Sequence, residues 1–494
     1  MELRVKFLKW SAGIPVAMLN EETANLIGVR TKGRILIKTL SRNPKQISSI
    51  VDTARTLVSA NEIAVSSELK NILSLHAGQK VDVDLAPTPK SLFFIKKKIN
   101  KRELSQEEIN EIIKDVVNNS LSEAEIALFV SAMYEEGMNM KETVRLINAI
   151  LDSGQSLKLN LKNKLIVDKH SIGGIPGNRT TPLVVAICAA AGLVFPKSSS
   201  RAITTAAGTS DVIETIARVE FSLDELKKIV KKVGACLIWG GSLEMVPADE
   251  KIISIEKMLN IDPESQLLAS IMSKKLALGA KYILIDIPYG KTAKVTKKKA
   301  LRLKRKFEYL GKHFHKKIKV VLTHGDEPIG NGIGPALEIN DILRILTRAE
   351  QRPLDLENKS LFLAGQIFEM TGKAKKGKGI NFAKEVLDSR KALDKFHEIV
   401  KAQGGSSKRI KPAKFCKDII AKKTRKISEI DNKKINSLAR IAGSPMDKSA
   451  GLYLYKHVGD KVKKGEKIIT IYAESKSRMK EAISFYNSQK PILF

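Results

Sequence analysis

The stretch VDKHSIGGIPGNRTTPLVVAICAAAG, Val167 to Gly192, determines the fold that we expect for the middle of the chain. The apolar run KLIV at residues 164–167 predicts a short buried strand, and the Ala-rich segment after the glycines predicts a helix. The run LVFPKS follows as a second strand, and firmer strand patterns come at 281–288 and 317–323. This alternation is typical of an α/β domain with a mostly parallel sheet.

The glycine-rich loop in this stretch has the features of an anion site. Glycines let the backbone approach a ligand closely, and free N–H groups at a helix start attract negative charge. Lys169 and Arg179 add charge, and His170 and Ser171 add hydrogen-bonding groups. The order GIPGNRT does not match the P-loop or the dinucleotide-binding motif. The sequence therefore predicts a phosphate-binding loop of another kind.

A second loop, SSSRAITTAAGTSDVIE at Ser198 to Glu214, repeats this composition. It is rich in hydroxyl groups, and the planar fork of Arg201 suits phosphate. Ser210 or Asp211 is a candidate cap for the helix that follows. Two such loops on neighbouring strands fit two phosphates, or one phosphate and a sugar, and the composition leaves both options open.

The remaining sequence divides into further blocks. Residues 1–86 alternate like short strands and predict a β-rich, barrel-like domain. Residues 87–163 predict a helical domain, with capping boxes at Ser105, Ser122 and Asn139, and a later helical return near 255–280. The α/β phosphate-binding domain is expected at 164–426. Residues 427–494 predict a β-rich C-terminal part with a hairpin at VGDKVKKGE, similar to lipoyl- and biotinyl-type modules. The fold class is thus multidomain α/β.

Composition narrows the functional classes. No apolar run is long enough to span a bilayer and no signal-peptide pattern opens the chain, so we expect a soluble protein in the cytoplasm. The three cysteines lack metal-site or disulfide spacing, which predicts buried or half-buried thiols and no metal site. A net charge of +33 favours anionic ligands and keeps a basic nucleic-acid-binding protein as an alternative. Against that alternative, aromatic residues make up 5% and no RNA- or DNA-binding signature is present.

Longer motifs carry a resemblance to a known family. KHSIGG, SSRAITTAAGTSD and LLASIMSKKLALGA resemble the thymidine phosphorylase superfamily of pyrimidine-nucleoside phosphorylases. GGIPGNRTT, IDPESQLLASIMSKK and GDEPIGNGIGPALE resemble its archaeal-type AMP phosphorylases, over nearly the whole chain. The resemblance implies an active site in a cleft between the helical and α/β domains, closure of these domains over substrate, and a homo-oligomer, dimer or larger.

The reaction that this resemblance implies is phosphorolysis of a nucleoside 5′-monophosphate, giving free base and ribose 1,5-bisphosphate. AMP is the first candidate substrate and CMP and UMP are further ones. Inorganic phosphate is the co-substrate, and no metal or organic cofactor is required. Such an enzyme is a pentosyltransferase in nucleotide salvage.

The resemblance also assigns site residues. Asp262 is the implied proton donor to the base, although capping of the next helix is an alternative role for it. Lys169 and Ser171 are the implied phosphate ligands, and Lys274 faces the base, one helical turn from Ser270. The implied substrate-binding residues are Gly174, Ser200, Arg201, Ala202, Ile203, Thr204, Thr205, Thr209, Ser270 and Lys294.

One departure bears on base preference. The thymidine enzymes have an arginine upstream of the SIMSKK helix, and the matching stretch KIISIEKMLN has none. This departure weakens the thymidine interpretation and leaves base preference open, and a thymidine or pyrimidine-nucleoside phosphorylase without a 5′-phosphate site is the second candidate. Arg201 and the additional cations favour the monophosphate.

Overall fold

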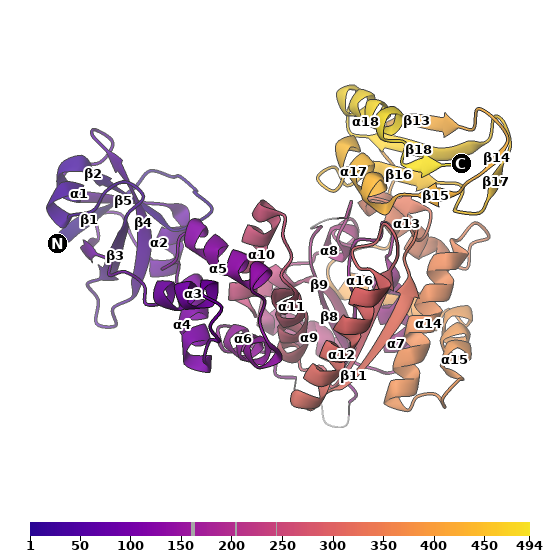
Figure 1. The fold of residues 1–494 in the computed structure, drawn as a ribbon, viewed down its shortest axis with the longest axis horizontal. Helices are drawn as coiled ribbons and strands as arrows, with labels where there is room; N and C mark the ends of the chain where they lie inside the picture. The colour runs from indigo at the N-terminus through magenta and orange to yellow at the C-terminus, as the bar shows by residue number, and fades with distance from the viewer. Residues whose placement is uncertain (160–163, 203–204, 244) are drawn as a thin grey trace. The chain divides into compact units, whose positions relative to one another are not determined.

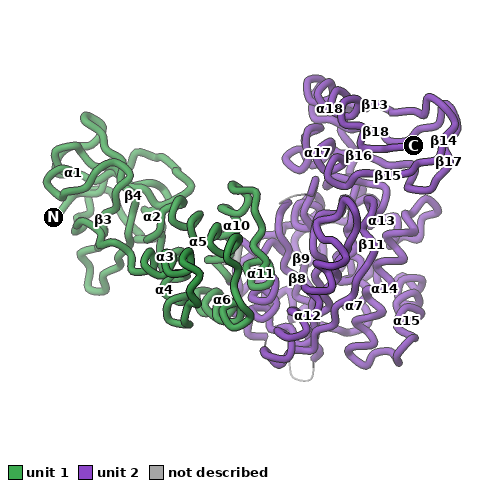
Figure 2. Tube along the Cα trace, viewed as in Figure 1, with its two compact units in different colours: residues 1–154, 246–270 green, residues 155–245, 271–494 purple. Residues whose placement is uncertain are grey.

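The computed structural model describes residues 1–159, 164–202, 205–243 and 245–494. The described chain forms two compact units (Figure 2). The first unit contains Met1–Gly154 and Val246–Ser270, and the second contains Gln155–Met245 and Ile271–Phe494. The predicted residues Ile203 and Thr204 lie outside the described residues.

The first unit begins with a closed six-stranded barrel, which confirms the predicted β-rich domain (Figure 1). Alternate residues point inward, as Ile35 and Ile37 do in β3. The strand order is β1-β5-β2-β4-β3-β6. The elements are β1 Glu2–Phe7, β2 Val16–Asn20, α1 Glu21–Ile27, β3 Arg34–Thr39, β4 Gln46–Ala54, β5 Glu62–Val65, α2 Ser67–Leu73 and β6 Lys80–Leu85.

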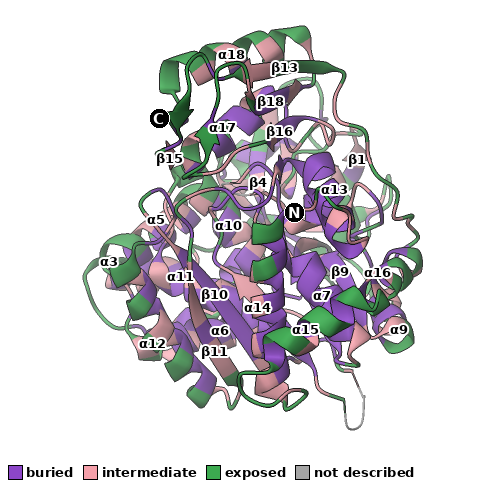
Figure 3. Cartoon of the chain, turned by 90° about the vertical axis from the view of Figure 1, so that its right-hand side faces the viewer, coloured by how far each residue is buried: buried purple, intermediate pink, exposed green. Residues whose placement is uncertain are grey.

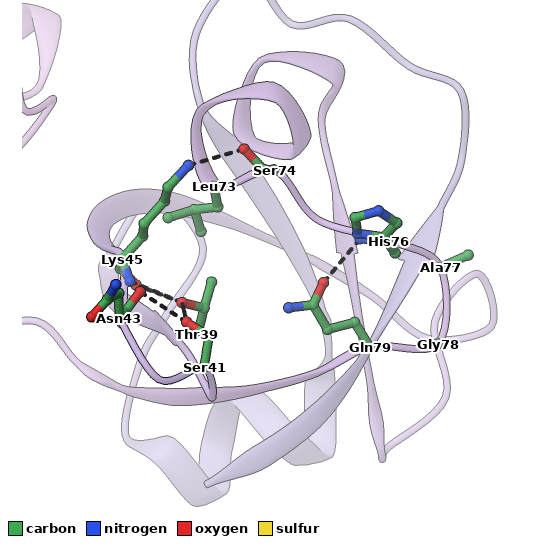
Figure 4. A pocket seen from close by; sticks show the side chains of 10 residues that line it. All are labelled: Thr39, Ser41, Asn43, Lys45, Leu73, Ser74, His76, Ala77, Gly78 and Gln79. Carbon is green, nitrogen blue, oxygen red and sulfur yellow. Dashed lines mark hydrogen bonds between the residues drawn. The ribbon is translucent and has the colours of Figure 1, made fainter.

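The barrel carries an open groove of about 660 Å³ at its surface (Figure 4). Lys45 Nζ donates to Ser74 Oγ at 3.0 Å there, and the His76 backbone N–H donates to Gln79. The lining residues are Thr39, Ser41, Asn43, Lys45, Leu73, Ser74, His76, Ala77, Gly78 and Gln79. None of the residues predicted from the sequence lines this groove.

The helical part of the first unit contains α3 Ser91–Ile99, α4 Gln106–Val117, α5 Glu123–Glu135 and α6 Met140–Asp152. All three predicted capping boxes are present: Ser105, Ser122 and Asn139 each cap a helix whose third residue is a reciprocating glutamate. The predicted helical return is α10 Pro247–Leu259, which packs on α4 and α5, with the start of α11 Glu264–Ala277.

The second unit is built around parallel strands, as predicted. Strand β10 Tyr282–Tyr289 pairs in parallel with β11 Lys317–His324 and β7 Val167–Ser171, and β8 Phe195–Ser199 pairs in parallel with β9 Ala235–Trp239. The strand predicted at KLIV, residues 164–167, begins later than expected, at Val167, and runs to Ser171. Strand β10 and helix α7 are largely buried (Figure 3). The helices and one short strand are α7 Thr180–Ala190, α8 Thr209–Ile213, α9 Leu223–Val233, η1 Gly240–Leu243, α12 Lys297–His313, β12 Gly332–Ile333, α13 Pro335–Leu346, α14 Leu354–Thr371, α15 Gly379–Asp388 and α16 Lys391–Ala402.

The C-terminal part is a small sheet with two helices. The predicted hairpin is present, since β16 and β18 pair antiparallel around VGDKVKKGE. The sheet order β12-β16-β18-β13 also takes in two strands that precede residue 427. The elements are β13 Phe415–Ile420, β14 Arg425–Lys426, β15 Glu429–Ile430, α17 Asn432–Ala442, β16 Gly451–Leu454, β17 Lys461–Val462, β18 Lys467–Ala473, α18 Lys476–Gln489 and β19 Ile492–Leu493.

Two further sequence expectations concern membranes and thiols. In the described ranges, no helix has the length and apolar character needed to cross a bilayer. Cys188 and Cys236 are buried free thiols, as predicted. Cys416 is exposed instead, because it lies on β13, the edge strand of the C-terminal sheet.

Candidate active site

Lys169 is a fully buried cation placed at the start of a helix. It is the middle residue of β7, and its Nζ donates to Thr180 Oγ1 at 2.7 Å and to Thr181 Oγ1 at 3.3 Å. These threonines are the first two residues of α7. The free N–H groups and dipole of a helix start favour an anion there and oppose a cation. An anion at this position would therefore complement both Lys169 and the helix.

The charge of Lys169 is poorly compensated by its surroundings. Burial, together with the nearby charges of Lys359 and Arg179, lowers the pKa of Lys169 to about 7, against the opposing effect of Asp286 and Asp168. No carboxylate in the described part of the chain forms an ion pair with it. The site therefore carries an excess of positive charge at its centre.

Ser171 and Asp286 form a second polar group beside this lysine. Ser171 Oγ and Thr323 Oγ1 each donate to Asp286 at 2.6 Å, and Lys359 Nζ lies 3.3 Å from the same carboxylate. Burial raises the pKa of Asp286, but the cations and these hydrogen bonds outweigh it and hold the pKa below its ordinary value. Asp286 is thus an anion that fixes the Ser171 hydroxyl at the mouth of the loop.

Asp168 joins three segments of the site. Its carboxylate lies 2.9 Å from Lys275 Nζ in α11 and 3.4 Å from Lys197 Nζ in β8. Burial lowers the pKa of Lys197 to about 7. Burial, with Lys275 and Lys197, also keeps the pKa of the half-buried His170 well below its usual value, so this imidazole is neutral at pH 7.

The cation of the second loop has a different environment. The Arg201 guanidinium stacks over the Trp239 ring at 4.7 Å from its centre and is held by hydrogen bonds that raise its pKa. It forms ion pairs with Asp211 at 3.4 Å, Glu214 at 2.7 Å and Glu220 at 2.9 Å. The hydrogen-bonding capacity predicted to serve a phosphate is thus taken up by carboxylates of the protein.

Other predicted residues of this loop are ordered by internal contacts. Asp211 accepts from the backbone N–H of Ala202 and of Gly208, both at 2.8 Å, as the third residue of α8. Thr205 Oγ1 donates to the Ala207 carbonyl at 2.8 Å, and Ser200 is exposed. The helix therefore begins earlier than predicted: Gly208 is its N-cap residue, Ser210 lies inside it, and Asp211 accepts from the cap backbone as its third residue.

Arg179 links the two loops. It precedes the first residue of α7, forms an ion pair with the buried Glu338, and donates to Thr209 Oγ1 at 3.1 Å and the Ala207 carbonyl at 2.9 Å. Thr209 is thus brought next to the first loop, as a shared site requires.

Gly174 and Lys294 also come together. Gly174 has φ +110°, and a Cβ atom there would lie 3.0 Å from Lys294 Cβ. A side chain at residue 174 would therefore be strained and crowded. The first loop therefore packs closely against the backbone of Lys294.

The remaining predicted residues lie on or beside α11. Asp262 comes two residues before this helix, in the first unit. Ser270 Oγ donates to Asp249 Oδ2 at 2.9 Å, and Gln266 donates to the other oxygen of this buried carboxylate at 2.8 Å. Lys274 follows Ser270 by one helical turn and belongs to the second unit. The predicted residues are thus divided between the units.

Sequence reasoning missed several charged neighbours of the loops. A lone carboxylate within the apolar run YILIDIPYG was a usable signal for Asp286. Lys359, Lys197 and Lys275 lie in ordinary helix or strand patterns, and no local signal separates them from surface lysines. Among the residues that the structure describes, His, Cys, Asp and Glu side chains form no group of three placed to hold a metal ion.

Family models match three segments of the chain. Residues 93–154 match the glycosyl transferase family helical bundle domain, and residues 163–393 match the α/β domain of that family. Residues 426–492 match the pyrimidine nucleoside phosphorylase C-terminal domain.

Several curated proteins are similar over their full length. The AMP phosphorylases of Pyrococcus horikoshii and Thermococcus kodakarensis are 45% and 42% identical, with 100% of this chain and 97% of each relative aligned. The AMP phosphorylase of Pyrococcus abyssi is 48% identical over 88% of this chain and 87% of its own. Among solved structures, anthranilate phosphoribosyltransferase from Thermus thermophilus is similar in fold, with 18% identity and a TM-score of 0.52 over 63% of this chain and 99% of that one.

Proposed function

The chain belongs to the AMP phosphorylase family, and on that premise we propose that it catalyses phosphorolysis of nucleoside 5′-monophosphates. AMP and inorganic phosphate give adenine and ribose 1,5-bisphosphate, and CMP and UMP are further candidate substrates. The observation that carries this proposal is the buried Lys169 at the start of α7, whose charge an anion would complement. The enzyme is a pentosyltransferase.

Phosphate is bound by the first loop in this proposal. Lys169 supplies the charge, and the backbone N–H groups at the start of α7 supply oriented donors. Ser171 donates its one O–H to Asp286, so its oxygen can only accept, from the protonated oxygen of hydrogen phosphate. Lys169 and the backbone N–H groups are preorganised donors that hold the attacking phosphate oxygen in place while charge shifts during the reaction.

The nucleotide is bound by the second loop and its neighbours. Lys294 lies against Gly174 of the first loop and Thr209 lies beside that loop, where backbone and hydroxyl groups can contact sugar and 5′-phosphate. Arg201 shapes this loop through its carboxylate partners. Ser270 and Lys274 contact the base, and the remaining members of the proposed nucleotide-binding loop are Ser200, Ala202, Ile203, Thr204 and Thr205.

Asp262 is the proposed general acid. A phosphate oxygen forms a bond to C1′ of the ribose, and the bond from C1′ to the base nitrogen breaks with its electron pair on the base. Asp262 donates a proton to that nitrogen, and the proton of the hydrogen phosphate restores the acid. Positioned acids of this kind contribute about 10²- to 10⁴-fold to the rate.

The same proposal implies which cofactors, cellular location and oligomeric state to expect. The reaction needs no metal and no organic cofactor, because phosphate is the nucleophile and a carboxyl group supplies the proton. We place the enzyme in the cytoplasm as a homo-oligomer, a dimer or larger. Light scattering that gives the mass of one chain would contradict the oligomer.

The test is phosphate-dependent release of free base from AMP, CMP, UMP, thymidine and uridine in parallel. We expect release from the monophosphates alone, and a loss of about 10²- to 10⁴-fold in Asp262→Asn. Asp224→Asn, on an exposed carboxylate of α9, is the matched control and retains full activity. Release from thymidine or uridine alone would instead identify a pyrimidine-nucleoside phosphorylase.

A further inference from the structure

A side chain of the C-terminal part bridges the two loops. Asn436, in α17, accepts from the backbone N–H of Ala206 at 2.9 Å and donates to the Gly174 carbonyl at 3.2 Å. Its side chain is buried, with 4% of the residue exposed. One amide group thus satisfies a donor of the second loop and an acceptor of the first, although 262 residues separate it from Gly174 along the chain.

Asn432 makes a related contact one helical turn earlier. Its Nδ2 donates to Thr292 Oγ1 and to the Gly325 carbonyl, both at 2.9 Å, and the residue is fully buried. Thr292 lies two residues before Lys294, whose backbone lies against Gly174. Residues four apart share one face of a helix, so one face of α17 holds all three segments.

The helix that carries these amides is itself firmly held. Ile435 and Leu438 of α17 are fully buried in the core of the C-terminal part. Ala206 of the second loop belongs to the same core, and Lys448 forms an ion pair with Glu214 just after α8. The C-terminal part is therefore packed against the second loop as well as hydrogen-bonded to it.

We propose that Asn436 is a positioning residue for phosphorolysis: it fixes the spacing of the Gly174 loop and the Ala206 loop, so that the C-terminal part sets the geometry of phosphate and nucleotide binding. This inference rests on the proposed function. Asn436 contacts the loop backbones and not the reacting atoms. Displacement of a positioned group by about 1 Å can cost about a hundredfold in rate.

The test compares Asn436→Ala with Asn340→Ala. Asn340 is a matched control, because it is also buried and bridges two backbone groups, donating to the Ile410 carbonyl at 2.7 Å and accepting from the Ile410 N–H at 3.1 Å. Both variants lose two hydrogen bonds of a buried amide, so both should melt at a similarly lowered temperature. The measurements are melting temperature, phosphate affinity by calorimetric titration, and the KM for phosphate and kcat with AMP.

We expect kcat/KM for phosphate to fall about tenfold to a hundredfold in Asn436→Ala, with a weaker phosphate affinity, and both to stay near wild type in Asn340→Ala. Equal phosphate affinity and kinetics in the two variants would overturn the proposal. If the alanine variants do not fold, Asn436→Ser and Asn340→Ser replace them, with the same expectation. A wild type that binds phosphate but releases no adenine would contradict the proposed function, and the titration would still decide the role of Asn436.

Discussion

Lys169 of the first loop donates to two threonine hydroxyls, whereas Arg201 of the second loop is paired with three carboxylates. The two loops have similar sequences, each with glycine, hydroxyl residues and a cation beside a helix start. Their electrostatics differ because Asp211, Glu214 and Glu220 follow Arg201 closely in the chain, and the corresponding stretch after Lys169 has no acidic residue.

This difference separates a binding cation from a structural one. A buried cation without a paired carboxylate destabilises the empty protein, and an anionic ligand removes that cost when it binds. A cation that the protein already neutralises gains much less from a ligand. In the proposed function the first loop therefore binds phosphate, and the backbone and hydroxyl groups of the second loop remain for the sugar.

Lys169→Met should weaken phosphate binding by the first loop, and its effect should be the largest of these variants. We expect kcat/KM for phosphate to fall about 10²- to 10³-fold, as for loss of a preorganised donor. The melting temperature should stay level or rise, because the substitution removes a buried and poorly compensated charge. The matched control is Lys98→Met, which should melt lower because it leaves the buried Glu142, 2.9 Å from Lys98, without its partner. A lower melting temperature in Lys169→Met would show that the lysine is structural.

Arg179→Met should separate the loops and also destabilise the protein. It leaves the buried Glu338 without its cation, which costs about 3–5 kcal/mol of unfolding free energy. The double variant Arg179→Met with Glu338→Gln removes the unpaired charge, so chemical denaturation should show part of the stability restored. Phosphorolysis should stay low in both, because the contacts to Ala207 and Thr209 remain lost. Full activity in the double variant would show that this link is not needed.

The pH dependence of anion binding sharpens the comparison further. Sulfate does not titrate near neutral pH, so it reports the protein alone. Lys169 and Lys197 have pKa values lowered to about 7, so both are cationic below pH 7 and become neutral as the pH rises through 7. Sulfate affinity should therefore fall with rising pH, by about tenfold per unit at most for each proton taken up. In Lys169→Met this slope should decrease. An affinity independent of pH between 6 and 9 would contradict the account.

Arg201→Met should have the smallest effect on binding. Glu214 keeps Lys448, and the partly exposed network contributes about 1 kcal/mol. Hydrogen bonds from Arg201, with that from Lys448, lower the pKa of Glu214 to about 2, so the stability that Arg201 contributes is present at neutral pH and is lost as the pH falls toward 2. Thermal melts should show a modest loss at pH 7 that disappears in acid. A stability difference that persists unchanged at low pH would show that charge is not its origin.

Much of the fold could be predicted from the sequence because its signals are local. Strand alternation predicted the barrel, and Ser105, Ser122 and Asn139 with their glutamates predicted three helix starts. The inclusion of β12 and β13 in the C-terminal sheet could not be predicted, because pairing between distant short strands has no local signal.

The candidate site was predictable in its loops but not in its charges. Composition located the Lys169 loop and the Arg201 loop, and both are present beside helix starts. The carboxylates that pair with Arg201 follow it closely in the chain. The partners of Asp286 and Arg179 beside the first loop, Lys359 and Glu338, come from other helices and have no local signal. Asn436 is the clearest case, since an asparagine in an ordinary helix pattern gives no indication that it touches both loops.

The most direct test of this account is a calorimetric titration of inorganic phosphate into wild type, Lys169→Met and Arg201→Met at one pH below 7. We predict that Lys169→Met loses most of its phosphate affinity and that Arg201→Met stays within about threefold of wild type, as expected for a cation that the protein itself already pairs. Loss of phosphate affinity in Arg201→Met with normal affinity in Lys169→Met would contradict it, and would move the phosphate site to the second loop.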